Sequence, residues 1–546
     1  MTAISAAVAA TAIMAGAAVV MLVGSVVFSV SADRRSLTYD RMLGLGTPFV
    51  FAIALSTGAM ESLSRPYDRW DEARFAMTLA ISQGIPLYSP PDQGAQLPTI
   101  YGPVAPLVYL PATLATRPDV AMVIAGVIAQ ACFFAPIAWL CFWPRVRGDP
   151  KAVAERRCFD LLLLSASVFV CTRLSPLHYS GFRIHVDAPA LGFAGLACLM
   201  VSLGTGRRSV PRRPPTWMLV AALLATLAVF SKQTLAPLLP ALVIHVWVSQ
   251  GLRAGIRFAG VLAIVLGCLA GFFVWTFGFR EMAFHTFVIP TSHPLTASAR
   301  RVINAVVQSC VPFASVPLMW WIAEARFTGR PIAIGLGRSR WQREPWILFC
   351  LTALCCLPTA ALAFAKEGGD VNNWSLLQYF LLLACLSAIR PLLHGGGASA
   401  GFACAESLLL ATTLLMAIHA ATIELPLAAL RNRAPNRTGA VYDYCRANPG
   451  QIYFAWHPAA VLAAEGELYH FYYALFDRDL AGHPVSPAHL AAHMPPHATM
   501  VVIEDLINEE FLERAFKGFG RRANDASLPA PLRGTILEKK VGPGGP

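Results

Sequence analysis

Residues 67–111 read YDRWDEARFAMTLAISQGIPLYSPPDQGAQLPTIYGPVAPLVYLP and lie between two strongly apolar segments. Five charged side chains fall close together near the start of this stretch: Asp68, Arg69, Asp71, Glu72 and Arg74. The spacing of its apolar residues predicts a helix over 71–83 with a rough apolar face, ended by Gly84 and Pro86. Acidic side chains are costly close to a bilayer, so their presence here indicates a reaction centre at the membrane surface.

The composition of the whole chain is that of a membrane protein. Of its 546 residues, 56% are hydrophobic and 14% are charged, whereas soluble proteins are about 45–50% apolar and about 25% charged. Long apolar runs recur from end to end and predict an all-α polytopic membrane protein. The formal net charge of +12 comes largely from arginines in short loops between these runs. The charge therefore indicates membrane topology, and no nucleic-acid partner is expected.

The apolar runs predict about twelve transmembrane helices. They lie near 5–30, 44–61, 119–142, 158–173, 186–204, 217–231, 234–249, 258–278, 306–323, 345–365, 375–393 and 405–426. The first run lacks a basic n-region, so we expect a transmembrane helix there rather than a signal peptide. Every second loop is basic, which places those loops in the cytoplasm and the alternate loops outside. Residues 99–116 are also apolar, but we expect an interfacial or re-entrant hairpin, because a further crossing would invert the loops downstream.

The sequence divides into two parts. Residues 1–429 form the predicted transmembrane domain, with a first large outer loop at 62–118, and residues 430–546 form a C-terminal soluble module. With twelve spans, the module lies outside the membrane, on the side of that loop. We expect a small α/β structure with a disordered tail. Its elements are predicted as strands at 451–456 and 499–503 and helices at 458–467 and 508–516. Cys445 is its only cysteine, so neither a disulfide framework nor a cysteine-based metal site is expected there.

Asp71 and Glu72 are the first candidates for chemistry. Neighbouring helical residues point about 100° apart, so these two are not expected to share one role. One interpretation is structural, because carboxylates in the first turn of a helix are stabilised by the helix dipole. The alternative is a general base that takes a proton from an acceptor hydroxyl. The helix, the turn at 84–88 and the Tyr101-Gly-Pro hairpin come as a set, and this favours the second interpretation.

The motif D-E-x-R-[FY]-A at 71–76, followed by ISQG-x-P-x-Y at 81–88 and YGP at 101–103, resembles the first outer loop of GT-C glycosyltransferases. These include the protein O-mannosyltransferase-like and lipid A aminoarabinose transferase-like enzymes, which transfer a sugar from a polyprenyl-phosphate carrier on the outer side of the membrane. The resemblance implies that Asp71 matches the catalytic acid, with Glu72 beside it. Such chains commonly have one span before this loop, whereas two are expected here. Over 430–546 there is no resemblance.

Other candidate residues lie in the later outer loops. Arg183 and Asp187 could form a structural pair at i, i+4 on a helix. The resemblance instead makes Asp187 a second acidic site residue, at or near a metal or the acceptor. His185 and Asp187 are too few to define a metal site by spacing. Lys232 would either extend to the membrane interface or contact the phosphate of a lipid-linked sugar.

Four more residues complete the candidate substrate-binding set. Tyr101 belongs to the YGP hairpin. His285 lies in the longest later outer loop, where an ordinary interfacial histidine is favoured over a phosphate contact. Lys366 and Asp370 flank a Gly-Gly turn that would either approach a ligand closely or simply connect two spans. The sequence makes no cofactor certain, and it leaves open whether Asp71 and Asp187 hold a divalent metal ion.

Together these features predict an integral membrane glycosyltransferase of the GT-C type in the inner (plasma) membrane, with its active site facing outward. Asp71 would act on a hydroxyl of an envelope glycan, lipid or protein, and polyprenyl phosphate would leave, stabilised by Lys232 with Arg183 or Lys366. The expected partners are the lipid-linked donor, the acceptor and membrane lipid. Two alternatives are a transporter or flippase of a lipid-linked saccharide and a non-catalytic envelope scaffold. The charges cluster at outer span ends rather than at mid-membrane, which favours the enzyme.

Overall fold

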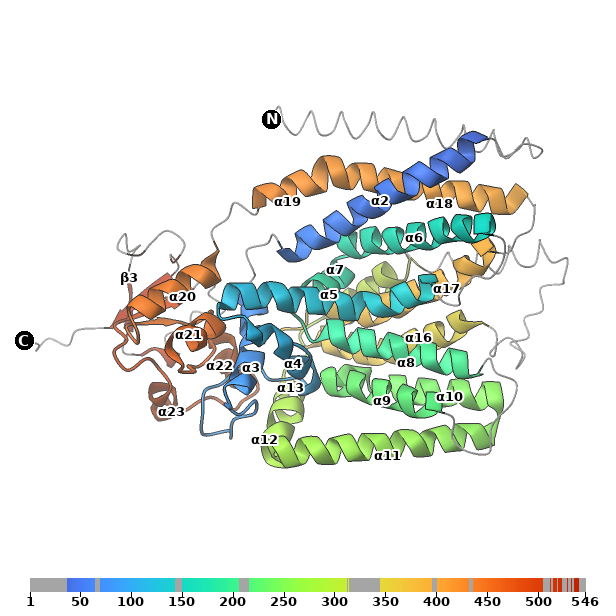
Figure 1. Ribbon diagram of the computed structural model, residues 1–546. Helices are drawn as coiled ribbons and strands as arrows, with labels where there is room; N and C mark the ends of the chain where they lie inside the picture. Colours follow the sequence, from blue (N-terminus) through green and yellow to red (C-terminus); the bar gives the residue numbers. More distant parts are fainter. Residues whose placement is uncertain are drawn as a thin grey trace, which may run out of the picture.

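The computed structural model is a bundle of long helices with a smaller part, built from the C-terminal residues, at one end (Figure 1). Several predicted features lie outside the residues it describes: the span at 5–30, most of the span at 306–323, Asp68, much of the helix at 508–516, and the tail. The described residues are 37–63, 69–142, 150–205, 216–311, 313, 344–394, 400–431, 436–503, 511, 514–517, 519–522, 528, 532 and 535–539.

Long apolar helices make up the bundle. They are α2 (Leu37–Leu63), α5 (Pro118–Phe142), α6 (Pro150–Arg173), α8 (Asp187–Thr205), α9 (Thr216–Ser231), α10 (Leu238–Gln250), α11 (Leu252–Phe277), α16 (Pro345–Ala365), α17 (Ser375–His394), and α18 (Ala400–His419), which continues through the π-helical turn η5 (Ala420–Glu424) into α19 (Leu425–Arg431). Among the described residues, 7 segments are long and apolar enough to cross a membrane, or up to 8 if α6 and α7 (Ser175–Phe182), bent by 104°, form one span. The polytopic all-α class is confirmed, and the number twelve stays a prediction.

Small residues let the central helix α8 pack closely against its neighbours. A Cβ added at Gly192 would lie 2.3 Å from the carbonyl oxygen of Cys132 in α5, and one at Gly195 would lie 2.8 Å from Pro136 of the same helix. Such close approach is how membrane helices gain packing energy without a hydrophobic driving force. The bundle therefore fixes the position of Asp187, the first residue of α8.

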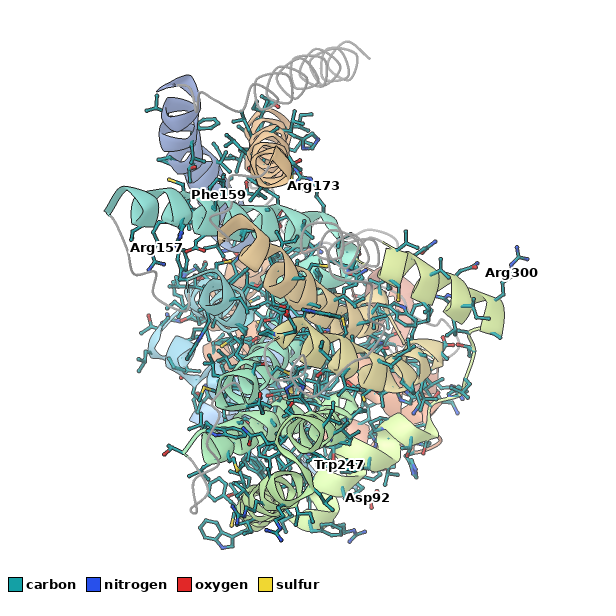
Figure 2. The ribbon with its side chains drawn as sticks, turned by 90° about the vertical axis from the view of Figure 1, so that its right-hand side faces the viewer. Asp92, Arg157, Phe159, Arg173, Trp247 and Arg300 are labelled. Atoms are coloured by element: carbon teal, nitrogen blue, oxygen red, sulfur yellow. The ribbon has the colours of Figure 1, made fainter. Side chains whose placement is uncertain are left out.

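Helix α6 carries an ion pair near each end. Near its start Arg157 forms an ion pair with Asp160 at 3.4 Å, and at its end Arg173 forms one with Glu424 of η5 at 3.0 Å. Figure 2 shows the bundle from the side away from the C-terminal residues, with Arg157 and Arg173 labelled on this helix. Arg173 thus joins α6 to the α18–α19 segment at the end of the bundle where α7 begins.

The segment between α2 and α5 stays at one end of the bundle. It contains α3 (Arg69–Ser82), a long loop, α4 (Val104–Val108) and the 3₁₀ turn η1 (Leu110–Leu114). The last two have 5 residues each, whereas a transmembrane helix needs about 20. Residues 99–116 therefore contain short helices and no membrane span, which agrees with the expectation, and their interfacial or re-entrant position stays a prediction. α3 matches the helix predicted at 71–83, and Gly84, with φ 76°, ends it.

Short elements from later loops gather at the same end of the bundle. Figure 1 shows α12 (Phe279–Ala283) and α13 (Ile289–Ser292) beside α3 and α4. Between α12 and α13 lies the π-helical turn η3 (Phe284–Val288). Two 3₁₀ turns complete this set: η2 (Gln233–Leu235) follows α9, and η4 (Val371–Trp374) precedes α17.

The C-terminal residues form the predicted α/β module. The helices are α20 (Arg437–Ala447), α21 (Pro458–Glu465), α22 (Tyr472–Leu480) and α23 (Pro487–Ala492), and the strands are β1 (Ile452–Phe454), β2 (Met500–Ile503), β3 (Phe519–Arg522) and β4 (Thr535–Lys539). The sheet order is β1-β2-β4-β3, with β1 and β2 parallel and the other two pairs antiparallel. The two strands predicted at 451–456 and 499–503 and the helix predicted at 458–467 are confirmed.

Helix α3 lies between the bundle and this module. Ala73 belongs to the same buried cluster as module residues such as Trp456 and Phe471. Trp70 makes edge-on ring contacts with Trp456 at 5.2 Å and with Tyr473 at 4.4 Å. Aromatic contacts of this kind add to the energy of burial. The charged helix of the first large loop is therefore the element on which the module docks.

Candidate functional site

Asp71 lies in the first turn of α3 and is 1% exposed. One carboxylate oxygen, Oδ2, forms an ion pair with Arg183 Nη1 at 2.9 Å, and the other, Oδ1, accepts the backbone N–H of Ile184 at 2.9 Å. Both partners belong to the extended segment between α7 and α8. The segment between α7 and α8 therefore orients the carboxylate.

The predicted helical pair of Arg183 and Asp187 is wrong. Arg183 caps the C-terminal end of α7 with φ −118° and ψ 158°, an extended conformation, and Asp187 starts the next helix. The two residues are therefore not one helical turn apart. Arg183 reaches Asp71 instead, across 112 positions of the sequence, which no local spacing rule could show.

Asp187 is fully buried and has several polar partners. Its Oδ1 lies 2.6 Å from Lys232 Nζ, and its Oδ2 accepts hydrogen bonds from Ser180 Oγ at 2.9 Å and Asn372 Nδ2 at 3.2 Å. Lys232 follows α9 and is 1% exposed, so it does not extend to an aqueous interface. Helix α7 and two later segments of the chain therefore meet at this carboxylate.

A close approach of two backbones positions Tyr101 near this pair. A Cβ at Gly102 would lie 1.9 Å from the carbonyl oxygen of Phe230, which stands two residues before Lys232. Only glycine fits at this contact, so the YGP hairpin passes directly over the end of α9. Burial, followed by the charge of Asp187, raises the pKa of Tyr101. Tyr101 thus lies within the electrostatic field of the Asp187 carboxylate.

Arg74 was not among the predicted site residues, although it stands in the charged motif three residues after Asp71. Its Nη2 donates a hydrogen bond to the hydroxyl of Tyr179 at 2.8 Å, and its guanidinium lies 5.5 Å from the ring centres of both Trp70 and Tyr179. Its Nη1 is buried and has no hydrogen-bond partner among the described residues. The signal for Arg74 was its spacing, because residues three apart share one face of a helix.

His185 is buried beside Asp187, with its Nδ1 3.0 Å from Asp187 Oδ2. Burial, followed by the positive charge of Arg74, lowers the pKa of His185 to about 4, and Lys232 acts in the same direction. Its ring centre lies 6.0 Å from that of Tyr101 and 5.2 Å from that of Tyr179. We call the resulting group the acid–base cluster: Asp71, Arg74, Tyr101, Tyr179, Arg183, His185, Asp187 and Lys232.

Three predicted residues have structural contacts elsewhere. His285 contacts the carbonyl of Ser89 at 2.8 Å through Nε2 and Thr99 Oγ1 at 3.2 Å through Nδ1, so it holds the loop between α3 and α4. Lys366 donates a hydrogen bond to the carbonyl of Pro290. Asp370 accepts the backbone N–H of Val371 and caps η4. From the same turn it is Asn372, missed by the sequence argument, that contacts Asp187.

Glu72 is fully buried, and its hydrogen-bond partners among the described residues belong to the C-terminal module. Its Oε2 accepts a hydrogen bond from Thr438 Oγ1 at 2.6 Å and lies 2.6 Å from His457 Nδ1. Its Oε1 accepts the backbone N–H of Ala460, near the start of α21, at 2.9 Å. We call these contacts the Glu72 clamp. They give Glu72 a docking role, which the adjacent Asp71 does not share.

The carboxylates of the cluster do not fit a metal ion. Among the described residues there is no group of three or more His, Cys, Asp and Glu that could hold one. Asp71 is paired with Arg183, and Asp187 with Lys232. A divalent cation would have to displace these side-chain cations and find further oxygen ligands. We therefore derive no step through a metal at this site.

Comparison with known proteins gives the fold. No protein-family model and no curated protein sequence matches the chain. Two solved structures match, both of ArnT from Cupriavidus metallidurans. The form bound to undecaprenyl phosphate has a TM-score of 0.53 at 11% identity, and the apo form has 0.56 at 12% identity. Each match covers 92% of this chain and 99% of that chain. The chain thus has the fold of ArnT, an aminoarabinose transferase of the GT-C superfamily, as the motif at 71–76 predicted.

Proposed function

We propose that this protein is a membrane glycosyltransferase that moves a sugar from a polyprenyl-phosphate donor to a hydroxyl group. The observation that carries the proposal is Arg74, a guanidinium with a buried and unpartnered N–H, on the helical face next to Asp71. A buried polar group without a partner is costly, so such a donor is expected to bind a ligand. The Asp71 carboxylate could accept a proton while the neighbouring Arg74 binds a phosphate, and this combination fits transfer of a sugar from a phosphate.

The donor phosphate is assigned to Arg74 and Lys232. Arginine hydrogen-bonds phosphate oxygens in a planar fork, whereas lysine acts as a compact point charge. Lys232 is paired with Asp187, which holds the ammonium group in place. The positive charges act most strongly when the bond between sugar and phosphate breaks, because negative charge then collects on the leaving phosphate.

The acceptor hydroxyl is assigned to Asp71. The hydroxyl oxygen of the acceptor attacks the anomeric carbon of the sugar. The bond between that carbon and the phosphate oxygen breaks, and the electron pair of this bond stays on the phosphate. The hydroxyl proton passes to the Asp71 carboxylate. Arg183 and the N–H of Ile184 fix the direction in which this carboxylate points. The chemistry of the cluster does not distinguish a glycan, a lipid or a protein as the acceptor.

The proposed site faces the outer side of the inner membrane. Arg156 and Arg157 lie near the start of α6, and Arg253 and Arg257 near the start of α11. Figure 1 shows these helix starts at the end of the bundle opposite to α3 and the module. Positive residues favour the cytoplasmic side, so the acid–base cluster and the module belong to the outer side.

The test is transfer of radiolabelled sugar from polyprenyl-phosphate donors in membranes that contain wild-type protein or Asp71→Asn. Loss of a general base lowers the rate by about 10²–10⁴-fold, and we expect a loss in this range. Asp443→Asn is the matched control, because this exposed carboxylate pairs only with Arg117 at the module surface among the described residues. Unchanged transfer by folded Asp71→Asn protein would overturn the assignment. Movement of intact donor lipid across the membrane, with no transfer, would establish the transporter instead.

A further inference from the structure

A hollow in the protein lies outside the acid–base cluster. It has a volume of about 660 Å³ and is formed where three parts of the chain meet: the loop after α3, the α12–η3 turn, and the end of α22. Figure 1 shows the first two of these side by side at the module end of α11. We call it the Arg478 pocket, and its lining residues are Pro91, Asp92, Phe279, Arg280, Ala283, Phe284, Val288, Arg478, His483 and Pro484.

Arg478 gives the pocket a buried positive charge. It is only 5% exposed, and its guanidinium donates hydrogen bonds to the carbonyls of His483 and Pro91 and lies 5.4 Å from the ring centre of Phe284. No carboxylate among the described residues forms an ion pair with it; Asp92 acts on it only at longer range. A buried charge without a counter-ion is strongly unfavourable. The pocket is therefore built to receive an anion.

A second arginine reinforces this charge. Arg280 is exposed on α12 and lines the same pocket. It forms no ion pair among the described residues. His483 also lines it, with its ring 5.5 Å from that of Phe284. The single acidic side chain of the lining is Asp92. Charge complementarity thus favours an anionic ligand that carries several hydrogen-bond acceptors, as a phosphate does.

The surroundings of the pocket are apolar and exposed. Trp275 at the end of α11 is 83% exposed, and Phe279 and Phe287, which follow it along the chain, are exposed as well. The candidate span Leu252–Phe277 is only 17% buried inside the protein. Aromatic side chains at the end of such a helix mark the level of the lipid headgroups. The ligand of the Arg478 pocket therefore combines an anion with a hydrophobic part.

We propose that the Arg478 pocket binds the phosphate headgroup of an anionic membrane lipid, whose acyl chains lie along the exposed face of α11. This lipid is distinct from the sugar donor. Phe284 lines the pocket, while its neighbour His285 points to the loop and contacts Ser89 and Thr99. The loop after α3 thus contributes to both places: Pro91 and Asp92 line the Arg478 pocket, and Tyr101 belongs to the acid–base cluster. A bound lipid would hold this loop in place without touching the reacting groups.

The test is lipid retention by the purified full chain, measured by native mass spectrometry. The probes are phosphatidylglycerol, phosphatidylcholine, soluble glycerol 3-phosphate and undecaprenyl phosphate. We expect wild-type protein to retain phosphatidylglycerol in preference to phosphatidylcholine. Arg280→Gln should lower that affinity about tenfold, the usual cost of one lost charged hydrogen bond. Arg478→Gln should lower it further.

Two variants keep the result interpretable. Arg514→Gln, an exposed arginine paired with Asp479 on the module, should bind as wild type does. Asp71→Asn should also bind normally, so that failure of the proposed reaction and failure of the lipid site are distinguishable. Wild-type retention by both pocket variants would overturn the proposal. Full competition by glycerol 3-phosphate would show a site for a free anion, and displacement by undecaprenyl phosphate at equal concentration would show a donor site. Either result would also overturn it.

Discussion

Asp71 and Glu72 are adjacent in the sequence, yet they contact different parts of the molecule. Asp71 is held by Arg183 and Ile184 of the bundle, and Glu72 by Thr438, His457 and Ala460 of the module. Both carboxylates are buried. On the bundle side the acid pairs with Arg183 and lies in a group of arginine, lysine and tyrosine side chains. The module side surrounds its acid with hydrogen-bond donors, as a structural anchor requires.

The difference teaches that one helix performs two tasks because its side chains diverge. A step of one residue turns a helical side chain by about 100°. The acidic pair of the motif therefore joins a proposed reaction centre to a docking surface in a single turn of α3. Movement of the module would be transmitted to Asp71 through one peptide unit, and each side of the helix can be tested separately.

The largest effect on the module side is expected for Glu72→Ala. This change leaves three buried donors, from Thr438, His457 and Ala460, without their acceptor. Each buried donor left without an acceptor costs about 1–3 kcal/mol. Hydrogen exchange of the full chain should show faster exchange in α20 and α21, and transfer activity should fall as a consequence. Unchanged exchange in these two helices would show that the Glu72 clamp does not hold the module.

The contacts on the bundle side of α3 are tested by Arg74→Gln. Loss of the guanidinium should lower kcat/KM for the polyprenyl-phosphate donor about 10–100-fold, the loss expected for one charged hydrogen bond to phosphate. Exchange in α20 and α21 should stay at the wild-type rate, in contrast to Glu72→Ala. Arg446→Gln is a suitable control, because this arginine lies over Tyr442 within the module. Faster hydrogen exchange in α20 and α21 of the Arg74→Gln protein would show that Arg74 also holds the module, and would contradict its assignment to phosphate binding alone.

The smallest expected effect is on the pH dependence of stability and comes from Asp477, a module residue that lies close to the bundle. Burial raises the pKa of Asp477 to about 8, and His293 Nε2 of the bundle lies 3.7 Å from its Oδ1. An ordinary aspartate has a pKa of about 3.9. The folded protein therefore holds a proton that the unfolded chain loses between these two values. Its stabilising contribution is complete below about pH 4 and disappears as the pH rises to about 8.

Thermal unfolding of the full chain tests whether stability falls with rising pH as Asp477 predicts. Wild-type protein should lose stability between pH 6 and pH 8, by at most about 1.4 kcal/mol per pH unit from this group. Asp477→Asn stays neutral at every pH and should flatten that slope. The same slope in the variant would show that other groups cause the pH dependence.

Much of the fold could be predicted from the sequence because apolar runs report membrane helices directly. The helix at 71–83, the hairpin at 99–116 and three of the four predicted module elements were found in this way. The motif at 71–76 also gave the GT-C fold, in spite of 11–12% identity to the matching structures. These predictions rest on local patterns, which the sequence contains in full.

The partners within the site could not be predicted, because they are long-range. Sequence spacing suggested that Arg183 pairs with Asp187, whereas a break between α7 and α8 directs Arg183 to Asp71 and leaves Asp187 to Lys232. Asn372 was missed because an amide in a turn gives no charge signal. Arg74 was missed because a cation next to acids in a helix usually pairs with them, and its burial without a full set of partners is visible only in three dimensions.

The Glu72 clamp also constrains when the protein becomes complete. Its partners follow Glu72 by 366, 385 and 388 positions. At about 5–20 residues per second, a ribosome makes α3 roughly 20–80 s before it makes these partners. During that interval the Glu72 carboxylate lacks its three hydrogen-bond donors, and α3 has no module packed against it. The contact between α3 and the module therefore cannot form until Thr438, His457 and Ala460 have been synthesised.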